Sequence, residues 1–193
     1  MISYDSHTAL VVVDVQNDFA DPDGNLFVQG GDSVVPKVNI EVMRALSAGA
    51  FVVYTQDWHP ESTAHFEKDG GIWPVHCVKD TWGAELHPGL EVSGPVVRKG
   101  SNGEDGYSGF TMRDPETGEE TATPLGEMLQ ERGIERVVVV GLALDVCVKA
   151  TALDASRDFQ TSVVAHASAP VEIQPGDGER ALEELRSHGV AIV

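Results

Sequence analysis

Short apolar runs rich in β-branched residues alternate with helix-like segments along the whole chain. The apolar runs cover 8–13, 50–55, 95–98, 136–140, 161–165 and 190–193, and helical patterns cover 34–48, 124–132, the residues that follow Asp145, and 179–188. Strands that are apolar on both faces and are separated by helices are typical of a parallel sheet covered on both sides. We therefore predict a three-layer, doubly wound α/β fold over 1–193, a single domain whose mostly parallel sheet has about six strands.

One segment interrupts this alternation. Residues 60–94 are rich in Gly, Pro, His and Trp and show no clear periodicity. Irregular segments of this length are uncommon inside compact domains and tend to build functional sites. We expect this segment to form a metal-site or lid region.

Chemically capable side chains follow four of the predicted strands. Asp14 follows the first strand, Asp57 and His59 follow the second, Lys99 follows the third, and Cys147 lies in the loop after the fourth. In an open α/β sheet the binding crevice lies outside the carboxyl ends of the strands. The sequence therefore predicts that these residues converge in one cleft.

Cys147 has the position of a nucleophile, between the end of an apolar strand and the start of a helix. The positive end of the helix dipole would favour the thiolate there. Asp14 is a candidate base for the thiol proton, and Lys99 is a candidate cation to stabilise the thiolate. The alternative for Cys147 is a small buried hydrophobic side chain, for Asp14 a turn or helix-capping residue, and for Lys99 an exposed cation at a strand end.

Asp57 and His59 are spaced so that both can reach one ion from an extended segment, since alternate residues share a side. His65 and His76, in the irregular segment, could complete the coordination. One carboxylate and several imidazoles suit Zn, Fe, Mn or Ni. A different interpretation makes Asp57, His59 and His76 the centre of a non-haem iron oxygenase, but it leaves the carboxylate, the lysine and the thiol of the cleft without a role.

Three aromatic residues lie near these groups in the sequence. Small aromatic ligands are held in apolar slots with few polar anchors, so we predict that the substrate contacts Phe19, Trp73 and Tyr107. The alternative is that these side chains belong to the core.

The formal net charge of −18 is spread along the chain rather than collected in a tail. Nucleic acids and anionic membranes bind proteins through clustered Lys and Arg side chains, so neither is an expected partner. The two cysteines do not form a disulfide framework, and the sequence shows neither a signal peptide nor an apolar stretch of 18 residues. We expect a cytoplasmic location, and formation of a homo-oligomer remains open.

The motifs around these residues resemble the nicotinamidase and pyrazinamidase branch of the isochorismatase-like cysteine hydrolases. The matching segments span nearly the whole chain: Asp14-Val15-Gln16-Asn17-Asp18-Phe19, Thr55-Gln56-Asp57-Trp58-His59-Pro60, Trp73-Pro74-Val75-His76-Cys77-Val78, Lys99-Gly100, Tyr107-Ser108-Gly109-Phe110 and Gly141-Leu142-Ala143-Leu144-Asp145-Val146-Cys147-Val148. The resemblance implies an isochorismatase-like hydrolase fold and an Asp-Lys-Cys triad of Asp14, Lys99 and Cys147. The chain departs from the family pattern at Leu144 and Val146, where a threonine and an aromatic residue are usual, and its lysine-to-tyrosine loop is one residue longer than in some relatives.

The resemblance also implies a divalent metal (Zn, Fe or Mn) on Asp57, His59 and His76, near the ring nitrogen of the substrate. His65 matches a further ligand that only some members have. The family pattern implies a cis peptide bond between Leu142 and Ala143.

The implied reaction is hydrolysis of nicotinamide, and of pyrazinamide, to the carboxylic acid and ammonia through an acyl thioester. Backbone N–H groups of Ala143 and Cys147 would bind the oxyanion, and no organic cofactor is needed. The alternative within the family is an amidohydrolase of another small amide, a carbamoyl or ureido compound. A non-catalytic binding module is difficult to reconcile with an intact triad.

Overall fold

A six-stranded sheet forms the centre of the computed structural model, which describes residues 2–193. Its strand order is β3-β2-β1-β6-β7-β8, and every neighbouring pair is parallel. The strands are β1 (Thr8–Val13), β2 (Phe51–Asp57), β3 (Val96–Lys99), β6 (Arg136–Leu142), β7 (Gln160–Ala169) and β8 (Ala191–Ile192). The prediction of a parallel sheet of about six strands is confirmed.

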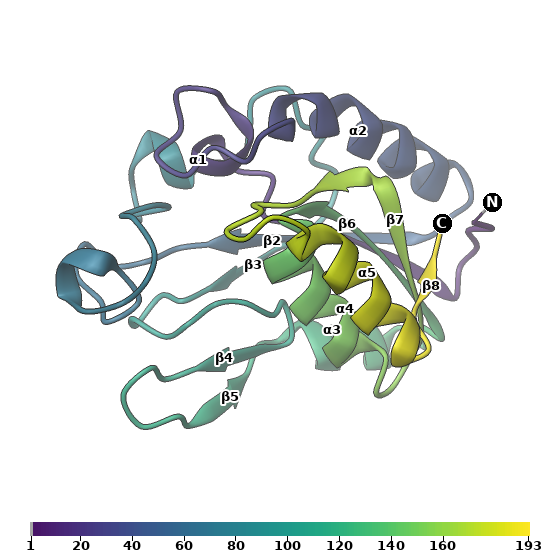
Figure 1. Ribbon diagram of the computed structural model, residues 1–193. Coiled ribbons are helices and arrows are strands. Elements are labelled where there is room, and N and C mark those ends of the chain that lie inside the picture. Colours follow the sequence, from purple (N-terminus) through teal and green to yellow (C-terminus); the bar gives the residue numbers. More distant parts are fainter. Residues whose placement is uncertain (1) are drawn as a thin grey trace.

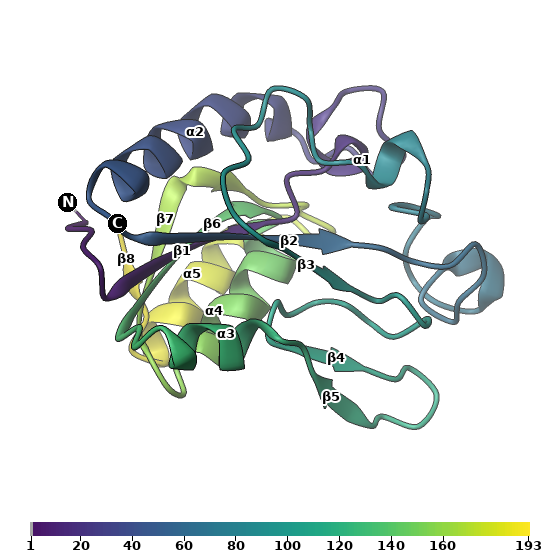
Figure 2. The same ribbon diagram turned by 180° about the vertical axis from the view of Figure 1, so that it is seen from behind.

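Helices cover both faces of this sheet (Figures 1 and 2). Helix α2 (Gly31–Ser47) lies on one face, and α3 (Leu125–Glu131), α4 (Lys149–Ala155) and α5 (Asp177–Ser187) lie on the other. The predicted three-layer, doubly wound arrangement is therefore confirmed.

The core is divided by the sheet into two apolar clusters. Every residue of β1 is buried, and alternate side chains point to opposite faces. Leu10 and Val12 pack in the cluster under α2, whereas Val11 and Val13 pack in the cluster under α3, α4 and α5. A strand with two buried faces needs apolar residues at every position, which explains the continuous run Leu10-Val11-Val12-Val13.

The strands next to the predicted cleft are longer at their carboxyl ends than the apolar pattern indicates. Strand β2 extends to Asp57 and β3 extends to Lys99, and these two residues are paired in the register of the two strands. Both residues therefore belong to the sheet instead of following it. Backbone pairing continues here because it depends on the peptide groups rather than on apolar side chains.

Several short elements have no counterpart among the predictions. They are α1 (Asn17–Ala20), the antiparallel hairpin of β4 (Thr111–Arg113) and β5 (Glu120–Ala122), and the 3₁₀ turns η1 (Glu67–Asp69) and η2 (Trp82–Ala84). Elements of three or four residues are too short to show a helical or strand period. The two turns are the regular elements within the irregular segment 60–94.

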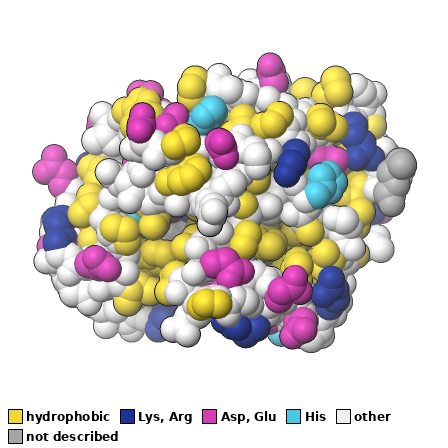
Figure 3. Space-filling view, turned by 45° about the horizontal axis from the view of Figure 1, so that its top comes forward, with side chains coloured by type: hydrophobic (Ala, Val, Ile, Leu, Met, Phe, Trp, Pro, Cys, Tyr) yellow, Lys and Arg dark blue, Asp and Glu magenta, His cyan; other side chains and the backbone are white. Residues whose placement is uncertain are grey.

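Acidic side chains are scattered over the face seen in Figure 3 and do not form one patch. Among the helices that the structure describes, none combines the length and the apolar character that a membrane span requires.

Candidate active site

Asp14, Lys99 and Cys147 meet at the carboxyl edge of the sheet. Lys99 Nζ lies 2.7 Å from Asp14 Oδ2 and 4.0 Å from Cys147 Sγ. A carboxylate oxygen of Asp14 lies within 4.8 Å of the same sulfur. The structure thus brings the three predicted catalytic side chains into one cluster.

The position of each of these side chains follows from a local feature of the fold. Asp14 directly follows β1 with a positive φ of 46°, and its Oδ1 accepts a 2.7 Å hydrogen bond from Thr55 Oγ1. Lys99 ends β3, and its ammonium also donates to the carbonyl of Gly106. Cys147 lies in a π-helical turn, η3 (Leu144–Val148), between β6 and α4.

Burial controls the ionisation of the Asp14–Lys99 pair. Burial raises the pKa of Asp14 to about 6, although the Lys99 charge acts in the opposite direction. Burial also disfavours the charged form of Lys99, but the carboxylates of Asp14 and Asp57 outweigh it and hold the lysine pKa well above its usual value. Lys99 is therefore a permanent cation, and Asp14 is a stronger base than an ordinary carboxylate.

The expectation of a thiolate at Cys147 is wrong for the resting protein. Burial raises the pKa of the Cys147 thiol well above its usual value, and the nearby Lys99 charge compensates only in part. Cys147 lies inside the π-helical turn rather than at the first residue of α4. Loss of hydration has a larger effect on the pKa of this thiol than the Lys99 charge, so the sulfur needs a base to remove its proton.

The peptide bond between Leu142 and Ala143 is cis, as the family pattern predicted. Ala143 caps the π-helical turn, and its carbonyl accepts hydrogen bonds from the N–H groups of Val146 and Val148. Ala143 and Cys147 both line the pocket described below. Their backbone N–H groups as oxyanion donors stay a prediction.

Three buried histidines form a second cluster beside the first. His59, His65 and His76 each offer a ring nitrogen within 4.8 Å of the others. His65 Nδ1 lies 2.6 Å from Asp105 Oδ1, and His76 Nδ1 lies 2.7 Å from the carbonyl oxygen of Pro74. Both acceptors require a proton on Nδ1, so in the neutral form of each ring Nε2 carries the lone pair.

The ring nitrogens of His59 have no hydrogen-bond partner among the described residues, although the side chain is completely buried. Buried polar atoms without a partner are rare and often mark an ion or a water. Burial lowers the pKa of His76 to about 4, so this ring is neutral at neutral pH. Two imidazoles oriented by their Nδ1 partners and an unpartnered third form a donor set that suits a divalent transition metal.

Asp57 lies between the two clusters. Its Oδ1 is 2.5 Å from Lys99 Nζ, and its Oδ2 is 3.8 Å from His59 Nε2. Burial disfavours its ionisation, but Lys99, His59 and His76 together hold the pKa of Asp57 well below the usual value. Asp57 is thus an anion that binds Lys99 with one oxygen and can offer the other to an ion at the histidine cluster.

A partly open pocket lies beside these groups. Its polar wall contains Asp57, His65, His76 and Cys147, and its apolar lining includes the three predicted aromatic residues: Phe19, Trp73 and Tyr107, with Leu26, Val146 and Val171.

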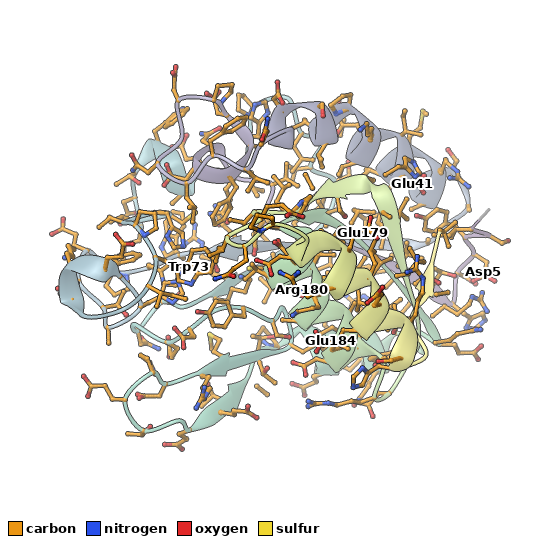
Figure 4. The ribbon with its side chains drawn as sticks, in the orientation of Figure 1. Asp5, Glu41, Trp73, Glu179, Arg180 and Glu184 are labelled. Carbon is orange, nitrogen blue, oxygen red and sulfur yellow. The ribbon has the colours of Figure 1, made fainter. Side chains whose placement is uncertain are left out.

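Trp73 Nε1 donates a 2.9 Å hydrogen bond to Tyr107 Oη, which fixes two of these aromatic side chains against each other. Figure 4 shows Trp73 on the irregular segment, at the end of the sheet to which the strands run. Of the two departures from the family pattern, Val146 lines the pocket, whereas Leu144 packs in the core.

Several residues of this site were not predicted from the sequence. They are Thr55 beside Asp14, Gly106 beside Lys99, Asp105 beside His65, and Leu26 and Val171 in the pocket wall. None of them continues a periodic pattern or a recognised ligand spacing. Thr55 and Asp105 carried a usable signal, since Thr55 begins one of the segments that resemble the family and Asp105 is an acidic residue two positions before Tyr107.

Comparisons with known proteins assign the chain to a family. The family model of the isochorismatase domain matches residues 8–193. The chain is 38% identical to the nicotinamidase/pyrazinamidase of Mycobacterium tuberculosis, over 96% of this chain and 97% of the relative.

Two solved structures are similar over nearly their full length. The pyrazinamidase of Pyrococcus horikoshii in complex with zinc has a TM-score of 0.86 and 40% identity, covering 97% of this chain and 98% of that one. PnC1 from L. infantum in complex with nicotinate has a TM-score of 0.88 and 34% identity, covering 100% and 95%. The family match over residues 8–193 includes every segment between Asp14 and Cys147 that builds the two clusters of the site.

Proposed function

Because the chain belongs to the isochorismatase family, we propose that it hydrolyses nicotinamide, and also pyrazinamide, to the carboxylic acid and ammonia. The observation that carries this proposal is the convergence of Asp14, Lys99 and Cys147 beside a pocket that is lined by two of the three clustered histidines, His65 and His76. Relatives that carry the names nicotinamidase and pyrazinamidase support it, since they match this chain over nearly its full length.

In the first half of the reaction Cys147 forms a thioester. Asp14 accepts the proton of the thiol as Sγ attacks the carbonyl carbon of the amide. Asp14 then gives this proton to the amide nitrogen, the C–N bond breaks, and ammonia leaves. A carboxyl group with a pKa of about 6 is suited to both steps, because it is ionised at neutral pH and still returns the proton readily.

In the second half a water molecule cleaves the thioester. Asp14 takes a proton from the water, whose oxygen attacks the thioester carbon, and Cys147 leaves and recovers the proton. Lys99 keeps its charge throughout and stabilises the negative sulfur and the Asp14 carboxylate. The oxyanion of each tetrahedral intermediate is assigned to backbone N–H groups of Ala143 and Cys147, and one such donor contributes about 3–4 kcal/mol in transition states of this kind.

The three histidines and Asp57 are proposed to hold a divalent metal ion. A metal bound there would supply a Lewis acid that fixes the ring nitrogen of the substrate. The neutral His76, the orientation of His65 and the unpartnered His59 support this assignment. The zinc complex of the Pyrococcus horikoshii relative is consistent with it.

Phe19, Trp73 and Tyr107 are proposed to contact the faces and edges of the pyridine ring. They line the same pocket as Cys147, and Asp57, His65 and His76 are the other ionisable side chains in its lining apart from Tyr107 and Cys147. An apolar slot with one polar wall orients a flat heteroaromatic ring so that its amide faces the sulfur.

The test is ammonia release from a panel of small amides. We expect turnover of nicotinamide and pyrazinamide, and much slower turnover of benzamide, which keeps the amide but lacks the ring nitrogen. Faster release from a carbamoyl or ureido compound would assign the chain to a different amidohydrolase activity. Equal rates for benzamide and nicotinamide would show that the proposed metal site does not bind the ring nitrogen of the substrate.

A further inference from the structure

Asp105 contacts one of the three histidines from outside the pocket. Its Oδ1 lies 2.6 Å from His65 Nδ1, and the two side chains are 15% and 4% exposed. We propose that Asp105 is a positioning residue, which fixes His65 with Nε2 directed at the metal site and thereby sets the affinity of the site for divalent metal. This inference rests on the proposed metal site but not on the identity of the amide substrate.

The chemistry of the pair selects one form of the imidazole. An ionised carboxylate can only accept a hydrogen bond, so the metal-binding, neutral form of the His65 ring has its proton on Nδ1 and its lone pair on Nε2. A carboxylate behind a ligating histidine also makes that histidine a stronger ligand, and loss of such a partner commonly lowers metal affinity 10–100-fold.

The three histidines differ in what lies behind them. His76 has a neutral backbone carbonyl as its partner, and His59 has no hydrogen-bond partner among the described residues. His65 has a charged partner that is 40 residues away in the sequence. Within this trio, therefore, the ligand strength of His65 depends on a second side chain that can be changed without altering any ligand.

The backbone holds Asp105 firmly in place. Its N–H donates to the carbonyl of Arg113 at 2.7 Å, and its carbonyl accepts from the Arg113 N–H at 3.1 Å. Arg113 ends β4, so the β4–β5 hairpin anchors this carboxylate. The next two residues also contact the site, since Gly106 accepts from Lys99 and Tyr107 accepts from Trp73. The short segment 105–107 therefore touches the histidine cluster, the triad and the pocket wall in succession.

The experiment measures zinc affinity by competition with a chromophoric chelator at one fixed pH. We expect Asp105→Ala to weaken zinc binding by about 10–100-fold. Asp105→Asn should weaken zinc binding less than Asp105→Ala does. Its amide oxygen still accepts the hydrogen bond from His65 Nδ1, although the negative charge is gone. Glu120→Gln is the matched control, because it removes one negative charge from the exposed strand β5 of the same hairpin. Its zinc affinity should stay within about twofold of the wild-type value.

A second comparison separates positioning from general damage. In a His65→Ala background, Asp105→Ala should cause no further loss of zinc affinity, because its partner is already absent. Equal losses in both backgrounds, or a loss below about threefold in the wild-type background, would overturn the proposal. If Asp105→Ala does not fold, as judged by circular dichroism, the same comparison with Asp105→Asn decides it.

The experiments distinguish failure of this inference from failure of the proposed amidase function. A wild-type protein that binds none of zinc, iron and manganese overturns this inference and the metal assignment together, whereas ammonia release from nicotinamide tests the triad independently. A wild-type protein that binds zinc and releases no ammonia from any amide overturns the proposed function but leaves the Asp105 comparison valid.

Discussion

The Lys99 ammonium and the Asp14 carboxylate form a completely buried ion pair, with 2.7 Å between Nζ and Oδ2. Burial of two charges carries a desolvation cost that often exceeds their attraction, so such pairs are weak evidence for stability. Lys99 also contacts Asp57 at 2.5 Å, which places one cation between two carboxylates. The proposed catalytic role of these residues explains the arrangement better than stability does, and the arrangement gives a first prediction.

Replacement of Lys99 by methionine should destabilise the protein by about 3–5 kcal/mol, because it leaves two buried carboxylates without their cation. Lys149→Met is the matched control. Lys149 forms a 3.0 Å ion pair with Glu184 on the surface, where loss of a pair costs at most about 1 kcal/mol. Urea unfolding of the three proteins measures both changes. Equal losses would mean that Lys99 does not hold its two carboxylates together.

Replacement of Cys147 by alanine should abolish ammonia release while the fold and the metal content are retained. The sulfur is the proposed nucleophile, and removal of one atom at a turn should cost about 1 kcal/mol or less. Cys147→Ser should be nearly as inactive, since a hydroxyl ionises far less readily than a thiol. The control is Cys77→Ala, because Cys77 is buried and its sulfur is directed at the carbonyl of Gly83. Substantial release by Cys147→Ala would indicate a nucleophile other than this sulfur.

The value of kcat/KM for nicotinamide should fall on the acid side with a midpoint near pH 6. Burial raises the pKa of Asp14 to about 6, and below that pH the neutral carboxyl cannot accept the thiol proton. The acid limb should approach a tenfold loss per pH unit, and the rate should be level just above the midpoint. Metal content must be measured at each pH, so that loss of metal is not mistaken for protonation of Asp14. A midpoint near pH 4 would show that Asp14 behaves as an ordinary exposed carboxyl.

Replacement of Gly100 by alanine should weaken metal binding. Gly100 has a φ of +75°, and a Cβ there would lie 2.5 Å from His59 Cε1. Gly49 has nearly the same φ, +73°, with nothing within 4 Å of the added atom. Alanine should cost about 1–2 kcal/mol at either position because of the left-handed backbone, but only Gly100→Ala should displace His59. Thermal unfolding and zinc affinity of the two variants separate these effects, and equal zinc affinities would contradict the prediction.

The sequence predicted the sheet because a doubly covered strand has a local signature. The runs in β1 and β6 are apolar at almost every position. The local pattern alone therefore shows where each strand ends and which residues follow it. Asp14 and Cys147 could be identified as candidates on this basis, since the carboxyl ends of parallel strands must meet at one edge. The motifs around them added the implied chemistry. The roles of these residues as base and nucleophile stay predictions.

Only the tertiary structure decided which charges and partners surround those residues. The thiol of Cys147 is neutral because the folded chain removes it from water, an effect that has no local signature in the sequence. One carboxylate oxygen of Asp57 contacts Lys99 and the other faces His59. Asp105 contacts His65, which is 40 residues away in the sequence. Apolar periodicity is a property of neighbouring residues, so the sequence determined the strands and the edge at which the site lies. Ionisation and hydrogen bonding depend on atoms that folding brings together from distant segments, and these only the tertiary structure could determine.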